Sequence, residues 1–172
     1  LQVPDSIDKE RLDRWTEQGG VIVTTGQQPG LFGGPLYSLY KGISAIRLAE
    51  RLEELLGRPV LPVFWVASED HDWDEADHTY VIDTANQLVR LQVPDPGHIK
   101  RALHRIPLGE EIVDVVEQAA QHLPATDFSA PYVDRLREVY KPGATLADGF
   151  AGVLSSLLGP LGMCFADAAS PP

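Results

Sequence analysis

Two apolar runs on either side of one long amphipathic segment constrain the fold more than any other feature of this chain. The runs cover 21–25 and 60–67, and neither alternates with polar residues, which is typical of strands buried on both faces of a parallel sheet. Apolar residues between them recur at spacings of three and four, which predicts a helix from about Pro35 to Leu56. Because such crossovers are right-handed, we expect adjacent or near-adjacent parallel strands whose carboxyl ends share one edge.

Weaker patterns predict the remaining helices and strands of the chain. Helical spacing of apolar residues predicts helices at 6–18, 110–122 and 130–141, a further helix capped by Thr145, and a third buried strand at 163–167. Residues 88–93 and 100–106 alternate in period two around a Pro-Asp-Pro-Gly turn, which predicts an antiparallel hairpin. The expected fold class is α/β: a parallel sheet with an inserted antiparallel hairpin and peripheral helices.

Charge and cysteine content narrow the class of protein. The chain has 172 residues, with 14 Lys and Arg against 25 Asp and Glu, which gives a formal net charge of −11. A field of this sign disfavours nucleic acid and anionic membranes as partners. The single cysteine, Cys164, cannot form an internal disulfide, and the first residues lack the pattern of a signal peptide, so we expect a cytoplasmic protein. Because the sequence has no starting Met, we interpret the chain as one domain, 1–172, of a longer protein.

A glycine-rich loop joins the first strand to the long helix. It covers 26–34 and contains four glycines, and its backbone amides together with the helix N-terminus favour binding of a phosphate or carboxylate. The loop matches neither the dinucleotide-binding nor the P-loop spacing, and a tight turn that needs glycine for geometry alone is the alternative. Tyr37 and Lys41 follow one to two turns into the helix.

Acidic residues and two histidines follow the second strand, at the same edge of the predicted sheet. The segment 69–78 reads Glu-Asp-His-Asp-Trp-Asp-Glu-Ala-Asp-His, and it could hold Mg²⁺ or Zn²⁺ or act as general acid and base. A solvated or helix-capping loop is the alternative. Asp167, after the third strand, is a candidate for binding a ribose hydroxyl. We therefore expect one pocket lined by Gly26, Gln28, Gly33, Gly34, Glu69, Asp70, His71 and Asp72.

Two blocks of sequence resemble a known family. Residues 25–41 (TGQQPGLFGGPLYSLYK) and 62–78 (PVFWVASEDHDWDEADH) are similar to the cysteine-adding enzymes of bacillithiol biosynthesis, the cysteine ligase BshC family. The resemblance implies a Rossmann-like core interrupted by connecting peptides, with 86–142 as the insertion. It also implies a coiled coil and remaining core strands beyond this chain, a homodimer, and a cytoplasmic ligase that joins cysteine to glucosaminyl malate. The chain alone is then expected to be an inactive N-terminal fragment.

The candidate roles follow from these patterns and from the resemblance. The developing oxyanion or a phosphate is expected at Gly33, Gly34 and Pro35, and His71 with Asp70 and Asp72 is expected to handle the amine proton. The cofactor stays open: ATP is a candidate, and the sequence requires no metal. The alternatives are a metal-dependent hydrolase using His71, Asp72 and His78, and a nucleotide- or sugar-phosphate-binding module without chemistry. The candidate catalytic residues are Glu69, Asp70, His71 and Asp72, and the candidate substrate- or nucleotide-binding residues are Thr25, Gly26, Gln27, Gln28, Gly33, Gly34, Tyr37, Lys41, His78 and Asp167.

Overall fold

The chain forms two compact units that are each assembled from separate segments. The computed structural model describes residues 1–7, 9–97 and 101–169. The first unit contains 1–27, 36–67 and 154–172, and the second contains 28–35 and 68–153. The backbone therefore passes from one unit to the other four times.

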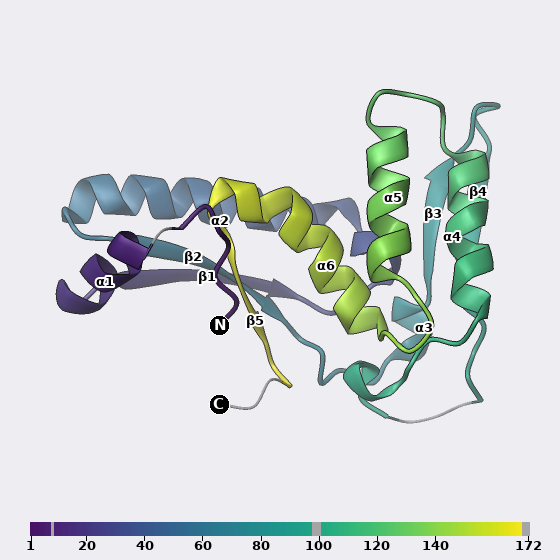
Figure 1. The fold of residues 1–172 in the computed structure, drawn as a ribbon, viewed down its shortest axis with the longest axis horizontal. Coiled ribbons are helices and arrows are strands. Elements are labelled where there is room, and N and C mark those ends of the chain that lie inside the picture. The colour runs from purple at the N-terminus through teal and green to yellow at the C-terminus, as the bar shows by residue number, and fades with distance from the viewer. Residues whose placement is uncertain (8, 98–100, 170–172) are drawn as a thin grey trace. The chain divides into compact units, whose positions relative to one another are not determined.

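The first unit is built on a three-stranded parallel sheet. Its strands are β1 (Val21–Gln27), β2 (Val60–Val66) and β5 (Cys164–Asp167), in the order β1-β2-β5. Val21 pairs with Val60 and Gln27 with Val66, and β5 joins the other side of β2 with Asp167 also opposite Val66. Helix α2 (Leu36–Leu56) links β1 to β2 and packs along both strands (Figure 1). The predicted parallel neighbours and their helical crossover are confirmed.

Helix α1 (Lys9–Glu17) covers part of one face of this sheet. Leu61 and Val63 of β2 point to that face and pack against Ile7, Leu12 and Trp15. The indole Nε1 of Trp15 donates a hydrogen bond of 3.0 Å to the carbonyl of Val21, which fixes the helix at the start of β1. The first predicted helix is therefore present, although Asp8 within the predicted range lies outside the described residues.

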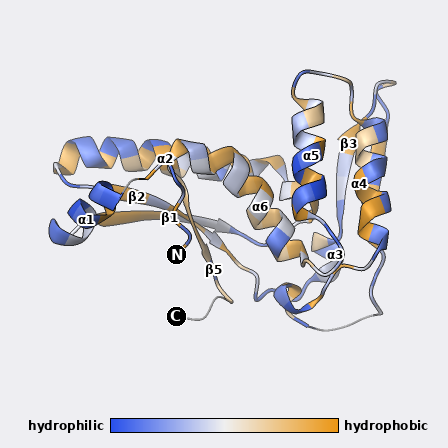
Figure 2. Ribbon diagram, in the orientation of Figure 1, coloured by the Kyte–Doolittle hydropathy of each residue, from blue (hydrophilic) through white to orange (hydrophobic). Residues whose placement is uncertain are grey.

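The second unit joins an antiparallel hairpin to three helices. The hairpin consists of β3 (His78–Ile82) and β4 (Leu88–Gln92), and the helices are α4 (Glu111–His122), α5 (Ser129–Val139) and the first part of α6 (Leu146–Leu158). Helix α4 packs on α5 and on the hairpin, and Figure 2 shows apolar and polar residues on different sides of α4. The two helices predicted as peripheral to the parallel sheet thus supply buried side chains to a core of their own. Short helices complete the chain: α3 (Trp73–Ala76) and three 3₁₀ turns, Leu31–Gly33, Leu103–Arg105 and Gly159–Leu161.

The hairpin forms, but the predicted pairing of its strands is wrong. The strand expected at 88–93 pairs with His78–Ile82, which lies before it in the chain, and not with 100–106. The turn explains this choice: the Asp83 carboxylate accepts hydrogen bonds from the backbone N–H groups of Ala85 and Gln87, and Asn86 adopts a left-handed conformation with φ of 57°. Residues 98–100, which follow the expected turn and include the start of the expected second strand, lie outside the described residues, and Leu103–Arg105 is a 3₁₀ turn.

The glycine loop adopts a left-handed path over three consecutive residues. Phe32, Gly33 and Gly34 have φ of 55°, 91° and 67°, although Phe32 carries a side chain that disfavours this region. The buried Tyr140 hydroxyl donates to the Gly30 carbonyl at 3.2 Å and accepts from the Gly33 N–H at 3.4 Å, and Tyr132 donates to the Phe32 carbonyl at 2.9 Å. Burial raises the pKa of Tyr132 to about 12, so this hydroxyl keeps the proton that it donates.

Gly33→Ala tests how tightly this loop is packed. Both Gly33 and Gly143 have positive φ, which costs an alanine about 1–2 kcal/mol. A Cβ at Gly33 would also lie 3.0 Å from Val153 Cγ1, whereas a Cβ at Gly143 would meet no atom within 4 Å. We expect Gly33→Ala to lower the free energy of unfolding by at least about 1 kcal/mol more than Gly143→Ala. Urea unfolding of the two variants measures the difference, and equal losses would contradict the described packing.

Candidate functional site

The carboxyl edge of the parallel sheet brings together residues from three strands. Gln27 and Asp167 flank β2 at the level of Val66, at the ends of β1 and β5. Gly26 pairs with Trp65, and a Cβ at this glycine would lie 2.7 Å from the Trp65 carbonyl oxygen, so only glycine fits here. Thr25 precedes it and is half-buried. The edge therefore carries polar groups from both outer strands of the sheet.

Lys41 reaches this edge from helix α2. Its Nζ donates to the Gln27 Oε1 at 2.9 Å and to the Gly26 carbonyl at 3.4 Å, and it lies 5.1 Å from the centre of the Tyr37 ring. The Gln27 amide in turn donates to the Tyr37 hydroxyl at 3.1 Å. No carboxylate forms an ion pair with Lys41 among the residues that the structure describes, so its charge is not neutralised there. The first unit thus brings together four of the candidate binding residues: Gly26, Gln27, Tyr37 and Lys41.

Two backbone N–H groups of the glycine loop, on which the anion prediction partly depends, are engaged within the second unit. The Gly33 N–H donates to the Tyr140 hydroxyl, and the Gly34 N–H donates to the Leu31 carbonyl at 3.1 Å. Pro35 has no N–H. These groups are therefore used to hold the loop itself, whereas Lys41, at the sheet edge of the first unit, has a charge available for an anion.

Gln28 connects the glycine loop to the acidic segment within the second unit. Its Nε2 donates to Asp70 Oδ2, while Asp70 Oδ1 accepts from the backbone N–H groups of His71 and Asp72. Partial burial raises the pKa of Asp70, but the Gln28 amide, the two backbone N–H groups and the nearby His71 outweigh it, so the net pKa is lowered. Asp70 is thus a fixed carboxylate, and its oxygens are already engaged.

The neighbouring candidates are more exposed or serve as caps. Asp72 Oδ1 accepts from the Glu75 N–H at 3.3 Å and caps helix α3. The His71 side chain is 73% exposed, and its Nδ1 lies 3.8 Å from Asp70 Oδ1, which is beyond hydrogen-bond length. Glu69 is exposed. Of the four candidate catalytic residues, His71 and Glu69 therefore have side chains without such structural roles.

His78 lies in a different environment from His71. Its Nδ1 is 2.8 Å from Oδ1 of Asp77, a buried carboxylate whose Oδ2 accepts from Gln92 Nε2 at 2.7 Å. Sequence reasoning did not select Asp77 or Gln92. Asp77 could have been selected from the sequence because it directly precedes His78. Gln92 could not, because its position opposite His78 depends on the register of β3 and β4.

A residue far along the chain also supports the acidic segment. The Ser68 carbonyl accepts from the His104 backbone N–H at 3.2 Å and lies 3.0 Å from His104 Nδ1, and the Leu103 N–H donates to the Asp70 carbonyl at 2.7 Å. The turn Leu103–Arg105 thus holds the start of the segment. Nothing in the local sequence around His104 indicated this contact.

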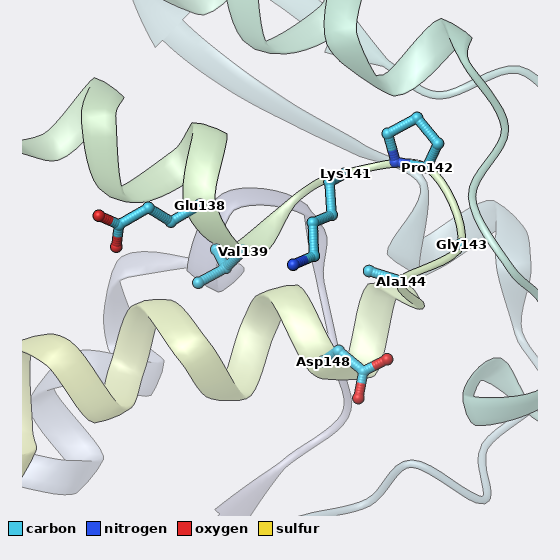
Figure 3. A pocket seen from close by; sticks show the side chains of 7 residues that line it. All are labelled: Glu138, Val139, Lys141, Pro142, Gly143, Ala144 and Asp148. Atoms are coloured by element: carbon cyan, nitrogen blue, oxygen red, sulfur yellow. The ribbon is translucent and has the colours of Figure 1, made fainter.

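Other candidate features lie apart from these groups. Within 1–7, 9–97 and 101–169, no three or more His, Cys, Asp or Glu side chains converge as a metal-ligand set, and so His71, Asp72 and His78 do not form one. Cys164 is buried, and this burial raises the pKa of its thiol. An open pocket of about 610 Å³ between the end of α5 and the start of α6 contains none of the predicted residues (Figure 3). Its lining consists of Glu138, Val139, Lys141, Pro142, Gly143, Ala144 and Asp148. The pocket expected from the sequence draws on both units and stays a prediction.

The parallel sheet with its helical crossover, and the polar groups at its carboxyl edge, define an α/β domain of the Rossmann-like class. Comparison with known families then identifies the family within this class. Residues 3–172 match the model of the bacillithiol biosynthesis BshC N-terminal Rossmann-like domain, and the chain belongs to this family.

Curated proteins are similar to the chain over most of its length. The proteins named cysteine ligase BshC of Heliobacterium modesticaldum and Salinibacter ruber are each 37% identical to the chain, over 158 and 162 residues, which is 92% and 94% of it. That of Solibacter usitatus is 34% identical over 187 aligned residues and 99% of the chain. The matches cover 29%, 29% and 31% of these relatives, so the chain spans somewhat under a third of their length.

Gln28→Ala tests the contact between the glycine loop and the acidic segment. Because the lowered pKa of Asp70 depends partly on the Gln28 amide, we expect the variant to raise that pKa towards its ordinary value of 3.8. A carboxyl whose pKa is lower in the folded than in the unfolded state stabilises the fold at pH values above its unfolded pKa. This stabilisation is lost as the pH falls through the folded pKa, so the wild-type protein should lose the contribution of Asp70 below about pH 3.8.

A carbon-13 titration of the Asp70 carboxyl measures the pKa directly. Gln27→Ala is the matched control, because the Gln27 amide contacts Lys41 and Tyr37 instead of Asp70. An unchanged Asp70 pKa in Gln28→Ala, or an equal change in both variants, would show that the Gln28 amide does not stabilise this carboxylate.

Proposed function

We propose that the full-length protein joins the carboxyl group of cysteine to the amine of glucosaminyl malate, which forms the amide bond of bacillithiol. The observation that carries this proposal is the family match over 3–172, nearly the whole chain. The relatives that match are named cysteine ligases, and the family model is named for bacillithiol biosynthesis.

The charge arrangement at the sheet edge supports small anionic substrates. Lys41 is exposed and stands beside Gln27 and Gly26, and its hydrogen-bond partners in the part of the chain that the structure describes are neutral oxygen atoms. A carboxylate or phosphate would gain a charge-assisted hydrogen bond from this ammonium. Malate and cysteine carboxylates and the phosphates of ATP all have this chemistry, and Lys41 is proposed to bind one of them. Asp167, at the same edge, is proposed to bind a ribose hydroxyl.

Amide formation from a carboxylate requires an activated acyl group, because oxide is a very poor leaving group. We propose ATP as the co-substrate that activates the cysteine carboxylate, and no step of the proposal requires a metal. Gln28 and Asp70 are proposed to fix the glycine loop against the acidic segment, which would keep the reacting groups oriented.

The setting of the reaction is proposed from the resemblance to this family. A coiled coil in the remainder of the protein is proposed to support a homodimer in the cytoplasm. Among the described residues, no helix combines the length and the apolar character needed to cross a membrane. The net charge of −11 is unsuited to nucleic acid or anionic lipid.

Lys41→Met in the full-length protein tests the proposed function and the role of this lysine. Incubation with glucosaminyl malate, cysteine and ATP should give bacillithiol, detected by mass spectrometry, and the variant should lose about tenfold or more in kcat/KM because a charge-assisted hydrogen bond contributes about 1.5–3 kcal/mol. Arg51→Met is the matched control, since Arg51 is an exposed cation on the same helix that pairs with Glu54. This variant should react as wild type does.

Two outcomes would count against the proposed ligase function, and a third against the expectation that this chain is inactive alone. The absence of bacillithiol with the wild-type protein would contradict the ligase function and leave ligand binding without chemistry. Hydrolysis that requires added zinc or magnesium would favour the metal-dependent hydrolase. Product formed by the isolated 172 residues would contradict the expectation that this chain is inactive alone.

A further inference from the structure

Asp77 is a buried carboxylate with all its polar atoms engaged. Its side chain is 3% exposed, its Oδ2 accepts from Gln92 Nε2, and its Oδ1 contacts His78 Nδ1 at 2.8 Å. Its backbone is fixed as well, because its N–H donates to the Trp73 carbonyl and its carbonyl accepts from the Val93 N–H, each at 2.9 Å. Asp77 therefore cannot turn away from His78 without leaving a buried charge unpaired.

This contact determines which nitrogen of His78 is basic. An ionised carboxylate only accepts hydrogen bonds, so Nδ1 of His78 is the donor and Nε2 keeps its lone pair in the neutral ring. The rings of His78 and Tyr80 also form a T-shaped contact, with their centroids 5.6 Å apart and their planes at 89°. The side chain is 25% exposed, and Nε2 has no hydrogen-bond partner among the described residues. The ring is thus oriented on one side and open on the other.

His71, the other histidine of the segment, lacks this support. Its ring is 73% exposed and 3.8 Å from the closest Asp70 oxygen, and both Asp70 oxygens are occupied by Gln28 and by backbone N–H groups. A general base is effective when a second group fixes its orientation and tautomer. The carboxylate–imidazole pair of Asp77 and His78 meets that requirement, whereas His71 does not in this structure.

We infer that His78 Nε2 is the proton acceptor of the ligation, with Asp77 as its positioning residue; this inference rests on the proposed function. The free amine attacks the carbonyl carbon of an acyl phosphate or acyl adenylate made from the cysteine carboxylate and a nucleoside triphosphate. The C–N bond forms, the C–O bond to phosphorus-bound oxygen breaks, and the phosphate or nucleotide leaves with the electron pair. The proton lost by the amine nitrogen moves to His78 Nε2. Strand β3, which begins at His78, packs against the turn Leu31–Gly33 of the glycine loop, so the base lies on an element next to that loop.

Substitution of His78 in the full-length protein tests the assignment. With glucosaminyl malate, cysteine and ATP, we expect His78→Gln to lower kcat by about 10²–10⁴-fold, the usual loss for a general base. His122→Gln, in the last turn of helix α4, is the control and should stay within about threefold of wild type. Asp77→Asn should lower kcat with little change in KM, because it acts through the orientation of the imidazole. Circular dichroism of each variant checks that it is folded.

The tautomer of His78 is a measurement that would not change if Asp77 had a purely structural role. Nitrogen-15 chemical shifts of histidine-labelled protein should place the proton of neutral His78 on Nδ1 in wild type and partly or wholly on Nε2 in Asp77→Asn. If that variant does not fold, Asp77→Glu replaces it, and the wild-type spectrum alone still tests the assignment of the proton to Nδ1.

The outcomes separate this inference from the proposed function. Wild-type protein that makes bacillithiol, together with His78→Gln that retains turnover within threefold, would overturn the role of His78 and leave the ligase function intact. A proton on Nε2 in the wild-type spectrum would also overturn it. If wild type makes no bacillithiol, the proposed function fails, and the role of His78 in this reaction fails with it.

Discussion

The buried Tyr140 hydroxyl is the contact on which the geometry of the glycine loop depends. It links the Gly30 carbonyl to the Gly33 N–H at a point where the chain adopts left-handed φ values, including one at Phe32. Such a path costs free energy and persists only when the surroundings fix it. Gln28 lies near the start of the same loop, and its amide donates a hydrogen bond to Asp70. A hydroxyl that lies 110 residues away in sequence therefore supports the conformation that brings Gln28 to the acidic segment.

The arrangement of the parallel sheet could be predicted from the sequence because each signal was local and strong. The runs at 21–25 and 60–67 lack polar alternation, and a proline and a glycine bound the helix between them. The pairing of β3 was not predictable in the same way, because His78–Ile82 follows a dense acidic stretch that masks its alternation. The hairpin register depends on the turn at Asp83 and Asn86, whose left-handed residue is not a glycine.

The residue types of the candidate site could be predicted from the sequence, but the role of each residue could not. The sequence indicated glycines, carboxylates and imidazoles, and the structure gives several of them structural tasks: Asp72 caps a helix, and the Gly33 and Gly34 N–H groups hold the loop. These tasks depend on partners such as Tyr140 and Leu31 that carry no pattern of their own. The two histidines also differ in the burial of the acid that precedes each of them. The Asp77 side chain before His78 is buried, whereas the Asp70 side chain before His71 is only partly buried. Spacing along a chain reports which groups are near each other, not which of their atoms remain unoccupied.

The division of the chain into interleaved segments has a consequence for its synthesis on the ribosome. The second unit has all its residues once position 153 has left the exit tunnel, whereas the first lacks its strand β5 until Asp167 has followed. Until then one side of β2 has no partner strand, and Phe64 lacks the stacked ring of Phe165. The helical and hairpin unit can thus reach its native contacts while the nascent parallel sheet is still open at that side. Neither unit corresponds to a continuous stretch that a genetic truncation could isolate.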